Sequence, residues 1–370
     1  MRLMFVARAI DGMAGGVERI ITVVMNALSA RGHQINLLTW DAAGAQSFYP
    51  IAPDIAWHRL NLGNPESRAS AAVMLRRRNA VRRVIRQHRP QAIVCFQDGP
   101  FVAVRAYSLG LGVPVVAAER NAPDRFDHTS TRRYRGAIYQ ALRLAARVTI
   151  QCESYRELYP AFLQSRIVCI PNPVEPAAVR AAPDAPNATG RYRLLSVGRL
   201  GYQKNYQVLV AAFSRLAPRY PDWDLAIVGE GEDRASLEQL VRTHGVEDRV
   251  SLPGVTKAID EWYASSHLFC LSSRWEGFPN ALAEALARGL PAVGFAGCAG
   301  VRDLIAPGRN GFLAPGNGDV DALAEALGEA MDDAEVRREM GSAARESVRS
   351  FQPGQVLSQW EAMLSEVALE

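Results

Sequence analysis

The sequence predicts an α/β protein of two doubly wound domains that face each other across a cleft, each with a mainly parallel sheet and helices on both of its faces. Two observations lead to this fold class. The chain has 370 residues, which is too long for one ordinary core and about right for two domains of roughly 150 to 200 residues each. Apolar runs of strand type also alternate with segments of helical period along the whole chain, as expected for a βαβ series.

The first half supplies the strands of one sheet. Its apolar runs are "LMFVA", "INLLTW", "AIVCF", "VPVVAA", "RVTIQC" and "RIVCIPN". Between the first two lies "VERIITVVMNALSARG", in which apolar residues recur at helical spacing and Gly32 marks the end of the helix. A stretch rich in proline and alanine follows the last run, and it predicts a linker near residues 175–190.

The second half repeats the pattern and predicts a second sheet. Its strand-like runs are "YRLLSVGRL", "WDLAIVGEGE", "VSLPGV", "HLFCLSSR", "LPAVGF" and "NGFLAP", with helical segments between them. The final segment, "PGQVLSQWEAMLSEVALE", has the pattern of an amphipathic helix. Such a helix can pack on either domain.

Composition limits the classes of protein to consider. Hydrophobic residues make up 48% and charged residues 22%, and no window approaches the roughly 18 apolar residues of a membrane span. The start, "MRLMFVARAIDG", lacks the features of a secretory signal, so we expect a cytoplasmic protein. The five cysteines are scattered without CxxC spacing, which favours buried free thiols over a zinc or redox site.

The charges are divided unevenly along the chain. Residues 1–180 hold 24 arginines against 12 acidic residues, whereas residues 181–370 hold 18 basic against 26 acidic residues. Seven arginines lie in "MLRRRNAVRRVIRQHR", which predicts a basic amphipathic helix. This helix either packs its apolar stripe on its own sheet and is otherwise solvated, or also binds anionic lipid, at about 1 kcal/mol per basic residue. We expect no nucleic-acid partner, because no zinc-finger, bZIP or RNP signature is present.

Ligands of open α/β sheets bind beyond the carboxyl ends of the strands, so the loops that follow the strands matter most. After the first strand, "AIDGMAGGVERI" places Gly15 and Gly16 directly before a helix. Glycines there let backbone N–H groups approach a phosphate at the positive end of the helix. A plain tight turn is the alternative, because the G-x-G-x-x-G spacing of dinucleotide sites is missing.

Two sequence patterns that resemble ligand-binding motifs are better explained by a structural role. "IVGEGEDRASL" lacks the third glycine of a dinucleotide fingerprint, and Glu230 and Glu232 would repel a pyrophosphate. Of the two DxD strings, the one at 222–224 leads into a strand and the one at 319–321 precedes a helix as a cap would. We therefore expect no metal site.

Two loops in the second half are the most informative. In "SVGRLGYQKNYQVLVAAF", Arg199 and Lys204 follow a strand, where a planar guanidinium and a compact ammonium group suit a diphosphate. In "SSRWEGFPNALAEALARGLPAVGF", Glu276 ends a turn and Pro279 fits the first position of a helix. Glu284 lies farther along that helix, with Asn280 one turn earlier on its face.

The two carboxylates have two interpretations. They can hold the hydroxyl groups of a polyol while the helix end and the two cations hold phosphate. Alternatively, acidic residues lie near a helix start because the helix dipole favours them.

With these residues the chain resembles the retaining glycosyltransferases of family four, which have the GT-B fold. The motif that carries the resemblance is "EGFPNALAE", followed by "ALARGLPAV". "GRLGYQKN", "GEGEDRASLEQL", "LPGV", "IPNPV" and "GGVER" occur with it in the family's order, so the resemblance covers nearly the whole chain.

The resemblance implies two Rossmann-like domains and their roles. Residues 1–180 with 354–370 would form the acceptor-side domain, because the last helix in such folds crosses back to it. Residues 190–353 would bind a nucleotide diphosphate sugar. The catalytic residues would be Arg199 and Lys204 on the diphosphate and Glu276 on the transferred sugar. The remaining donor contacts would be Glu284 on the ribose, the backbone of Gly277, Phe278, Pro279 and Asn280, and the loop of Gly15 and Gly16. The resemblance implies no cofactor and no enzymatic nucleophile.

The chain departs from the family pattern in one loop. Many members have a histidine after the strand that corresponds here to "VPVVAA", whereas this chain has Glu119, Arg120 and Asn121. These three residues are the candidate acceptor-side ligands. Gln97 and Asp98 after "AIVCF" are either further acceptor ligands or solvated loop residues. Relatives that build bacterial polysaccharides share "ERN" and "EGFPN", and many use UDP-sugars such as UDP-N-acetylgalactosamine or UDP-galactose.

The function that we expect is transfer of a sugar to a lipid-linked or similar saccharide acceptor, for a surface polysaccharide. The protein would be peripheral on the anionic inner face of the plasma membrane. The alternatives are a GDP-mannose-dependent mannosyltransferase, a sugar-nucleotide 2-epimerase and a non-catalytic sugar-nucleotide binding protein.

Overall fold

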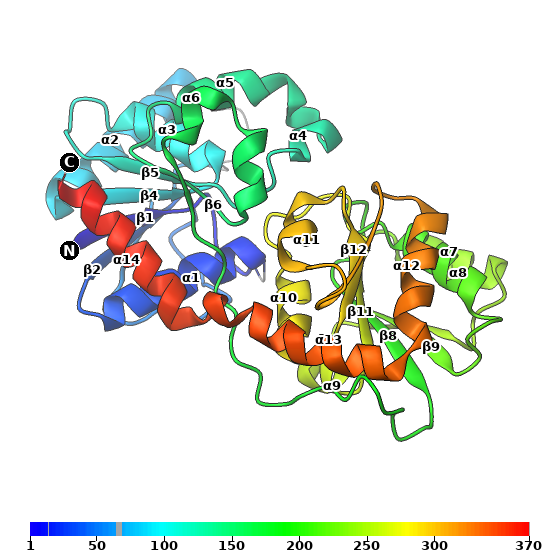
Figure 1. Ribbon diagram of the computed structural model, residues 1–370. Coiled ribbons are helices and arrows are strands. Elements are labelled where there is room, and N and C mark those ends of the chain that lie inside the picture. Colours follow the sequence, from blue (N-terminus) through cyan, green and yellow to red (C-terminus); the bar gives the residue numbers. More distant parts are fainter. Residues whose placement is uncertain (14, 64–68, 370) are drawn as a thin grey trace. The chain divides into compact units, whose positions relative to one another are not determined.

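The computed structural model describes residues 1–13, 15–63 and 69–369, and the chain forms two compact units (Figure 1). Unit 1 comprises Met1–Pro173 and Gly354–Glu370, and unit 2 comprises Val174–Pro353. Both units are parallel sheets with helices, so the predicted pair of doubly wound domains is confirmed. No helix among the described residues is long and apolar enough to span a membrane.

Unit 1 is built on a parallel sheet of seven strands in the order β3-β2-β1-β4-β5-β6-β7. The strands are β1 (Arg2–Val6), β2 (Gln34–Thr39), β3 (Ala56–Arg59), β4 (Ala92–Phe96), β5 (Val115–Ala118), β6 (Val148–Ile150) and β7 (Ile167–Cys169). Six of them correspond to the predicted apolar runs. The edge strand β3 was not predicted, because "AWHR" is short, partly exposed and mixed in polarity.

The helices of unit 1 lie between these strands in the chain. They are α1 (Gly16–Ala30), α2 (Ala71–His88), α3 (Asp98–Tyr107), α4 (Arg125–His128), α5 (Arg135–Leu142) and α6 (Ala161–Gln164), with 3-10 turns at Ser130–Tyr134 and Glu153–Leu158. In α2 the apolar side chains of Val81 and Ile85 are buried, as the amphipathic pattern predicts.

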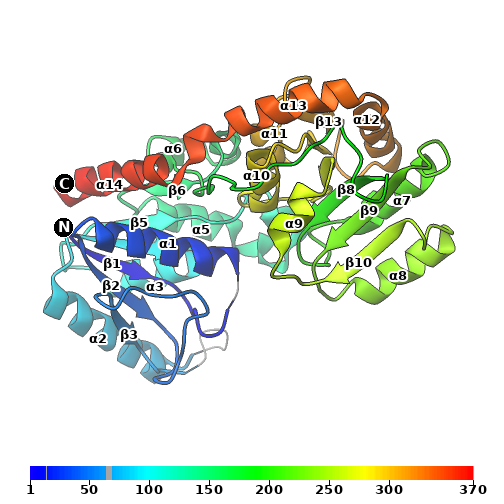
Figure 2. The ribbon, with the colours of Figure 1, turned by 90° about the horizontal axis from the view of Figure 1, so that it is seen from below.

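The last helix, α14 (Pro353–Leu369), completes the core of unit 1 (Figure 2). Its buried side chains belong to the same apolar cluster as residues of α1, β1 and β4. The ring of Trp360 stacks on that of Phe96 with 6.2 Å between their centres. The chain therefore returns to unit 1 after the whole of unit 2.

Unit 2 has a parallel sheet of six strands in the order β10-β9-β8-β11-β12-β13. The strands are β8 (Tyr192–Val197), β9 (Trp223–Val228), β10 (Val250–Gly254), β11 (Leu268–Leu271), β12 (Ala292–Phe295) and β13 (Gly311–Ala314). All six were predicted. The predicted linker at 175–190 contains no helix or strand.

Five helices of unit 2 separate its strands in the chain, and α12 (Val320–Asp332) and α13 (Ala334–Ser347) follow the last strand. The five are α7 (Tyr206–Leu216), α8 (Arg234–Thr243), α9 (Ile259–Ala264), α10 (Asn280–Ala287) and α11 (Ala299–Leu304), and a 3-10 turn at Arg349–Phe351 comes after α13. Residues of α7 and α12 share one apolar cluster with β8, β9 and β11.

The structural interpretation of the two DxD strings is confirmed. Asp224 accepts hydrogen bonds from Arg191 and Arg249, and Asp319 caps α12 by accepting one from the backbone N–H of Ala322 at 3.0 Å. The five cysteines are free thiols, and four of them are buried.

Candidate active site at the carboxyl ends of the strands

Lys204 and Glu276 lie in contact beyond the carboxyl ends of β8 and β11. Lys204 Nζ is 2.6 Å from Glu276 Oε1, although 72 residues separate the two in the chain. Their side chains are only 17% and 7% exposed. Ser273 Oγ donates a second hydrogen bond to the same carboxylate oxygen, also at 2.6 Å. The structure therefore brings together a cation and a carboxylate that the sequence assigned to two different loops.

The loop that carries Lys204 is shaped by glycines. A Cβ on Gly198 would lie 2.8 Å from Lys204 Cε and 2.8 Å from Tyr206 Oη, so only glycine leaves the lysine room. A Cβ on Gly229 or Gly231 would collide with backbone atoms of Gly198 or Leu200. The glycines of "GEGE" therefore serve close backbone packing of two loops, as their assignment to structure requires.

Several hydrogen bonds tie this loop to the one that carries Glu276. Ser272 Oγ donates to the carbonyl of Lys204 at 2.8 Å. Arg274 donates to Asn205 Oδ1 at 2.7 Å and to the carbonyl of Tyr202 at 3.1 Å. Asn205 has left-handed backbone geometry, with a φ of 55°. These bonds fix the backbone on both sides of the ion pair.

Arg199 pairs with a different carboxylate from the one that Lys204 contacts. Its side chain is 77% exposed, and its Nη2 is 3.0 Å from Glu232 Oε2. The pKa of Glu232 is lowered by a backbone hydrogen bond and by the charge of Arg199. The sequence predicted Arg199 beside Lys204 on a diphosphate, whereas in the structure Arg199 pairs with a glutamate.

The segment "EGFPN" turns into α10, with one difference from the prediction. Pro279 occupies the N-cap and not the first helical position, which is taken by Asn280. Phe278 is buried with its ring 5.9 Å from that of Phe351, edge to face, so only its backbone is available to a ligand. Gly289 follows the end of the helix with a φ of 84°, the left-handed geometry that glycine adopts readily.

Glu284 lies on α10 against a buried tyrosine. The hydroxyl of Tyr263 is 3.3 Å from Glu284 Oε2 and 3.2 Å from the carbonyl of Ala281. Burial, and next the negative charge of Glu284, raise the pKa of Tyr263 well above its usual range. The tyrosine therefore stays a hydrogen-bond donor that holds the carboxylate in place.

In unit 1, Gly15 caps the amino end of α1 and Gly16 is its first residue. A Cβ on Gly15 would collide with the carboxylate of Glu18, so glycine is needed for that carboxylate to fold back toward the helix end. Burial raises the pKa of Glu18. A carboxylate of the chain itself thus occupies the end of the helix that the sequence predicts for a phosphate.

The predicted acceptor-side residues divide into two groups. Asp98, the first residue of α3, accepts a hydrogen bond from Arg125 Nη2 at 2.6 Å, and Arg125 Nη1 is 3.5 Å from Glu119 Oε2. Asn121 follows in the same loop and is half-buried. These residues lie at the carboxyl ends of β4 and β5, where a ligand of this sheet would bind.

Arg120 belongs to the core and not to this surface. Its guanidinium group is 5.4 Å from the ring centres of both Phe96 and Trp360. It donates hydrogen bonds to Thr149 Oγ1 at 2.6 Å and to Asn172 Oδ1 at 3.4 Å. The side chain therefore cross-links the sheet to α14, and a role on the acceptor does not fit its position.

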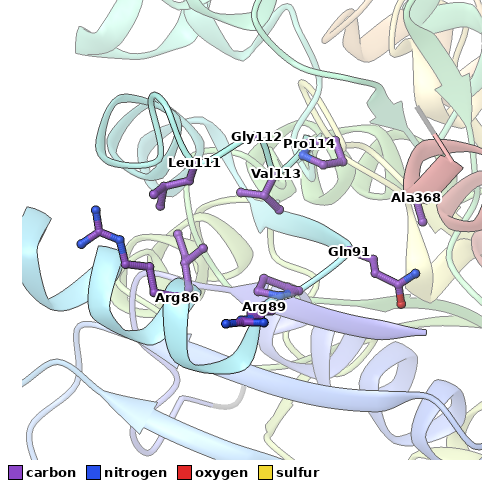
Figure 3. A pocket seen from close by; sticks show the side chains of 10 residues that line it. Arg86, Arg89, Gln91, Leu111, Gly112, Val113, Pro114 and Ala368 are labelled. Atoms are coloured by element: carbon purple, nitrogen blue, oxygen red, sulfur yellow. The ribbon is translucent and has the colours of Figure 1, made fainter.

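One cavity in the described part of the chain lies away from all of these residues. It measures about 590 Å³ and is lined by side chains such as Arg86, Arg89, Gln91 and Leu111 (Figure 3). Its walls come from the end of α2 and from the segments just before β4 and β5. This is the amino edge of the sheet of unit 1, opposite to the edge that carries Asp98 and Glu119.

The sequence did not single out several side chains that shape the two sites. Ser273 and Arg274 stand directly before "WEGFPN", and their position after β11 was the available signal. Arg125 was not predicted, because it follows "ERN" by several residues in a short helix, and only the fold places it between two carboxylates.

Comparisons with known proteins agree with this architecture. Residues 178–347 match the family model of "Glycosyl transferases group 1", and residues 14–178 match that of "Glycosyltransferase Family 4". An uncharacterized glycosyltransferase of Haemophilus influenzae is 27% identical over 95% of this chain and 97% of its own length.

Another relative is a Campylobacter jejuni enzyme. It is 22% identical over 99% of both chains, and its name is GalNAc-alpha-(1->4)-GalNAc-alpha-(1->3)-diNAcBac-PP-undecaprenol alpha-1,4-N-acetyl-D-galactosaminyltransferase. Among solved structures, HepE of Anabaena in complex with UDP and glucose superimposes with a TM-score of 0.77 at 18% identity, over 99% of both chains. The chain is therefore a glycosyltransferase of the family 4 type, with the GT-B fold.

Proposed function

We propose that the protein is a retaining glycosyltransferase that moves a sugar from a UDP-sugar to the saccharide of a lipid-linked glycan during surface polysaccharide synthesis. The observation that carries the proposal is the contact of Lys204 with Glu276 at the carboxyl edge of the unit 2 sheet. The name of the Campylobacter relative, an enzyme of an undecaprenol-linked glycan, supports the acceptor class. The UDP and glucose complex of HepE supports the donor class.

Lys204 is assigned to the departing diphosphate and Glu276 to hydroxyl groups of the transferred sugar. In the structure each neutralises the other's charge, and both side chains are largely shielded from solvent. When donor binds, the ammonium group turns to the phosphate, and Ser273 remains as a hydrogen-bond donor to the carboxylate. A fixed cation beside the leaving phosphate stabilises the negative charge that develops as the glycosidic bond breaks.

Arg199 and Glu284 complete the proposed donor site. Arg199 exchanges Glu232 for the diphosphate, which costs little because exposed ion pairs contribute about 0 to 1 kcal/mol. Glu284, held by Tyr263, accepts hydrogen bonds from the ribose. The departing phosphate takes the proton of the acceptor hydroxyl on the face that it leaves, so the reaction requires no nucleophile from the protein.

The donor assignment is tested by binding. Thermal unfolding of the protein is followed with a panel of UDP-, GDP- and ADP-sugars, because a ligand of the folded state raises the melting temperature. We expect stabilisation by UDP-sugars, which Lys204→Ala and Glu276→Ala variants lose while remaining folded. If only GDP-mannose raised the melting temperature, the donor would be a GDP-sugar and the proposed UDP-sugar would be wrong.

The reaction is tested by its products. Proton NMR of the transfer product should show the same anomeric configuration as the donor sugar. An inverted product would contradict the retaining mechanism. Conversion of the donor sugar to its 2-epimer in the absence of acceptor would identify an epimerase instead.

We also propose that α2 holds the enzyme on anionic membranes. Arg77 donates to the carbonyls of Leu62 and Gly63, and Arg82 donates to those of Tyr107 and Leu109, so both serve the fold. The other five arginines of the segment, together with the apolar Met74 and Leu75, are exposed. This combination of exposed cations and apolar side chains suits the surface of an anionic bilayer.

A further inference from the structure

Three charged side chains meet at the carboxyl ends of β4 and β5, and we call them the Asp98–Arg125–Glu119 cluster. Arg125, on α4, lies between the other two, with its Nη2 2.6 Å from Asp98 Oδ2 and its Nη1 3.5 Å from Glu119 Oε2. With all three ionised, the cluster carries one net negative charge.

The inner part of the cluster is buried and incompletely hydrogen-bonded. The Glu119 side chain is 4% exposed. Among the described residues, neither its Oε1 nor Arg125 Nη1 has a hydrogen-bond partner. Gln151 Nε2 donates to the backbone carbonyl of Glu119, while Gln151 Oε1 also lacks a partner. Folded proteins leave few buried polar atoms unpaired, so a polar occupant is expected here.

The unpaired atoms define the chemistry of that occupant. Glu119 Oε1 and Gln151 Oε1 accept hydrogen bonds, whereas Arg125 Nη1 donates one. A hydroxyl group both donates and accepts, so it can bridge the carboxylate and the guanidinium group. An anionic ligand would bring a second negative charge next to Asp98, whose carboxylate forms the outer end of the cluster. A neutral polyol therefore fits the hydrogen-bonding groups of the cluster best.

The cluster is reached from the edge of the sheet at which ligands of α/β proteins bind. The Asp98 side chain is 23% exposed and forms the outer end of the cluster. Gln97, between β4 and Asp98, has a φ of 72° and a ψ of 161°, a backbone region that non-glycine residues rarely adopt. Strain of this kind is concentrated at functional sites, and here it turns the start of α3 toward the cluster.

We propose that the Asp98–Arg125–Glu119 cluster binds the terminal sugar of the acceptor, that this sugar is uncharged, and that one of its hydroxyl groups bridges Glu119 and Arg125. The proposal rests on the proposed function, because it assigns the acceptor to unit 1. Beyond the proposed function, it specifies the acceptor sugar as a neutral hexose or N-acetylhexosamine and not a uronic acid. It also identifies Arg125 as a residue that binds this sugar.

The groups around Glu119 shift its pKa, and this predicts a pH dependence of acceptor binding that a purely structural role of the cluster would not produce. The charged and titratable groups that face it are Asp98, Arg120, Arg125, Tyr139 and Tyr159. Burial, and next the charge of Asp98, raise the pKa of Glu119 to about 7 against the opposing effect of the two arginines. Since the ionised carboxylate is the stronger hydrogen-bond acceptor, acceptor binding should strengthen as the pH rises through 7.

The first experiment measures acceptor binding without any donor. Octyl glycosides of galactose, N-acetylgalactosamine and glucuronic acid are titrated into the full-length protein and observed by saturation-transfer NMR. We expect the two neutral glycosides to bind and the glucuronide to bind at least about tenfold more weakly, because its carboxylate would be repelled by that of Asp98. Glu119→Gln should weaken binding of the neutral glycosides by about the same factor and abolish its pH dependence near 7.

The matched control is Glu153→Gln. Glu153 is an exposed carboxylate of the same unit and also accepts a hydrogen bond from an arginine, Arg156. The control variant should bind all three glycosides as the unmodified protein does.

The second experiment separates this inference from the proposed function. With donor and octyl glycoside both present, Glu119→Gln should raise the KM for acceptor about tenfold and leave unchanged the KM for donor and the rate of donor hydrolysis. An unchanged acceptor KM, or equal binding of the glucuronide, would overturn the inference and mean that the cluster holds buried water only. Absence of donor binding and hydrolysis would instead refute the proposed function, while the binding experiment still decides the role of the cluster.

Discussion

Lys204 is one of two lysines in a chain with forty arginines. Its surroundings give a physical reason for a lysine and not an arginine at this position. The ammonium group sits in a space bounded by Gly198 and Tyr206 and contacts Glu276. A planar guanidinium group is larger and places its charge differently, so charge alone does not make the two residues equivalent.

Lys204→Arg should therefore damage catalysis although it preserves the charge. We expect Lys204→Ala to lower kcat by about 10² to 10³, the usual cost of removing one preorganised group beside a developing charge. Lys204→Arg should recover only a small part of that loss. Initial rates with saturating donor measure the effect, and Lys257→Ala, at the exposed second lysine, is the control. A Lys204→Arg variant with normal kcat would remove the proposed role.

Glu119 should make the stability of unit 1 depend on pH. Its pKa in the folded protein is raised to about 7 from an ordinary value of 4.5. The folded state therefore holds the proton more tightly, and the resulting stability is complete below pH 4.5 and is lost as the pH rises through about 7. The shift corresponds to about 3 kcal/mol.

Denaturant unfolding at pH 5 and at pH 8 tests this dependence. The unmodified protein should lose on the order of 3 kcal/mol of unfolding free energy between the two, and Glu119→Gln should lose correspondingly less. Glu153→Gln should behave as the unmodified protein. Equal pH dependence in Glu119→Gln would show that other groups, such as the half-buried Asp124 with its raised pKa, cause the change.

Single residues also show the limits of reading a site from sequence. The positions of Lys204 and Glu276 after strands were sufficient to propose both, because parallel strands bring the loops at their carboxyl ends to one edge. The same reasoning placed Arg120 on the surface, although the side chain turns inward to Phe96 and Trp360. Trp360 arrives from the last helix, and nothing in the local sequence around Arg120 indicates that contact.

Among the elements, α2 combines structural and exposed arginines. The pKa of Arg82 is lowered by loss of hydration and by the positive charges of Arg86 and Arg78. These like charges crowd one face of the helix, and an anionic surface would relieve their repulsion.

Charge reversal on α2 should release the protein from anionic membranes. We expect the unmodified protein to float with vesicles that contain phosphatidylserine at low salt and to leave them as salt rises. Arg78→Glu/Arg86→Glu should reduce the bound fraction at least about tenfold, since each basic residue contributes about 1 kcal/mol. Arg302→Glu/Arg309→Glu, at exposed positions of unit 2, changes the net charge equally and should float normally. Equal flotation of the two variants would contradict the role of α2.

Elements with a strong periodic pattern were predicted well, and short ones were not. Runs such as "AIVCF" are apolar throughout because both faces of a central parallel strand are covered. The edge strand β3 and the short helix α4 are mixed in polarity, and tertiary contacts decide their conformation. Pro279 illustrates the boundary error of one residue that caps produce.

At the scale of the whole molecule, the two units have separate cores, and each should respond to its own perturbation. We expect two transitions in calorimetry. A UDP-sugar at 100 times its Kd should stabilise only the transition of unit 2, by about 2.7 kcal/mol. Trp360→Ala should lower only that of unit 1, by about 3 to 5 kcal/mol. Transitions that move together in both cases would mean that the chain unfolds as one cooperative body.

The return of the chain to unit 1 has a consequence for biosynthesis. The buried residues of α14, Trp360 among them, are needed to close the core formed by α1, β1 and β4. During translation the ribosome delivers them after all of unit 2, so unit 2 can fold while unit 1 is still open and exposes apolar surface. A nascent chain that stalls before about residue 354 would hold a complete unit 2 and an unfinished unit 1 with exposed apolar surface, which would make it a target for chaperones and proteases.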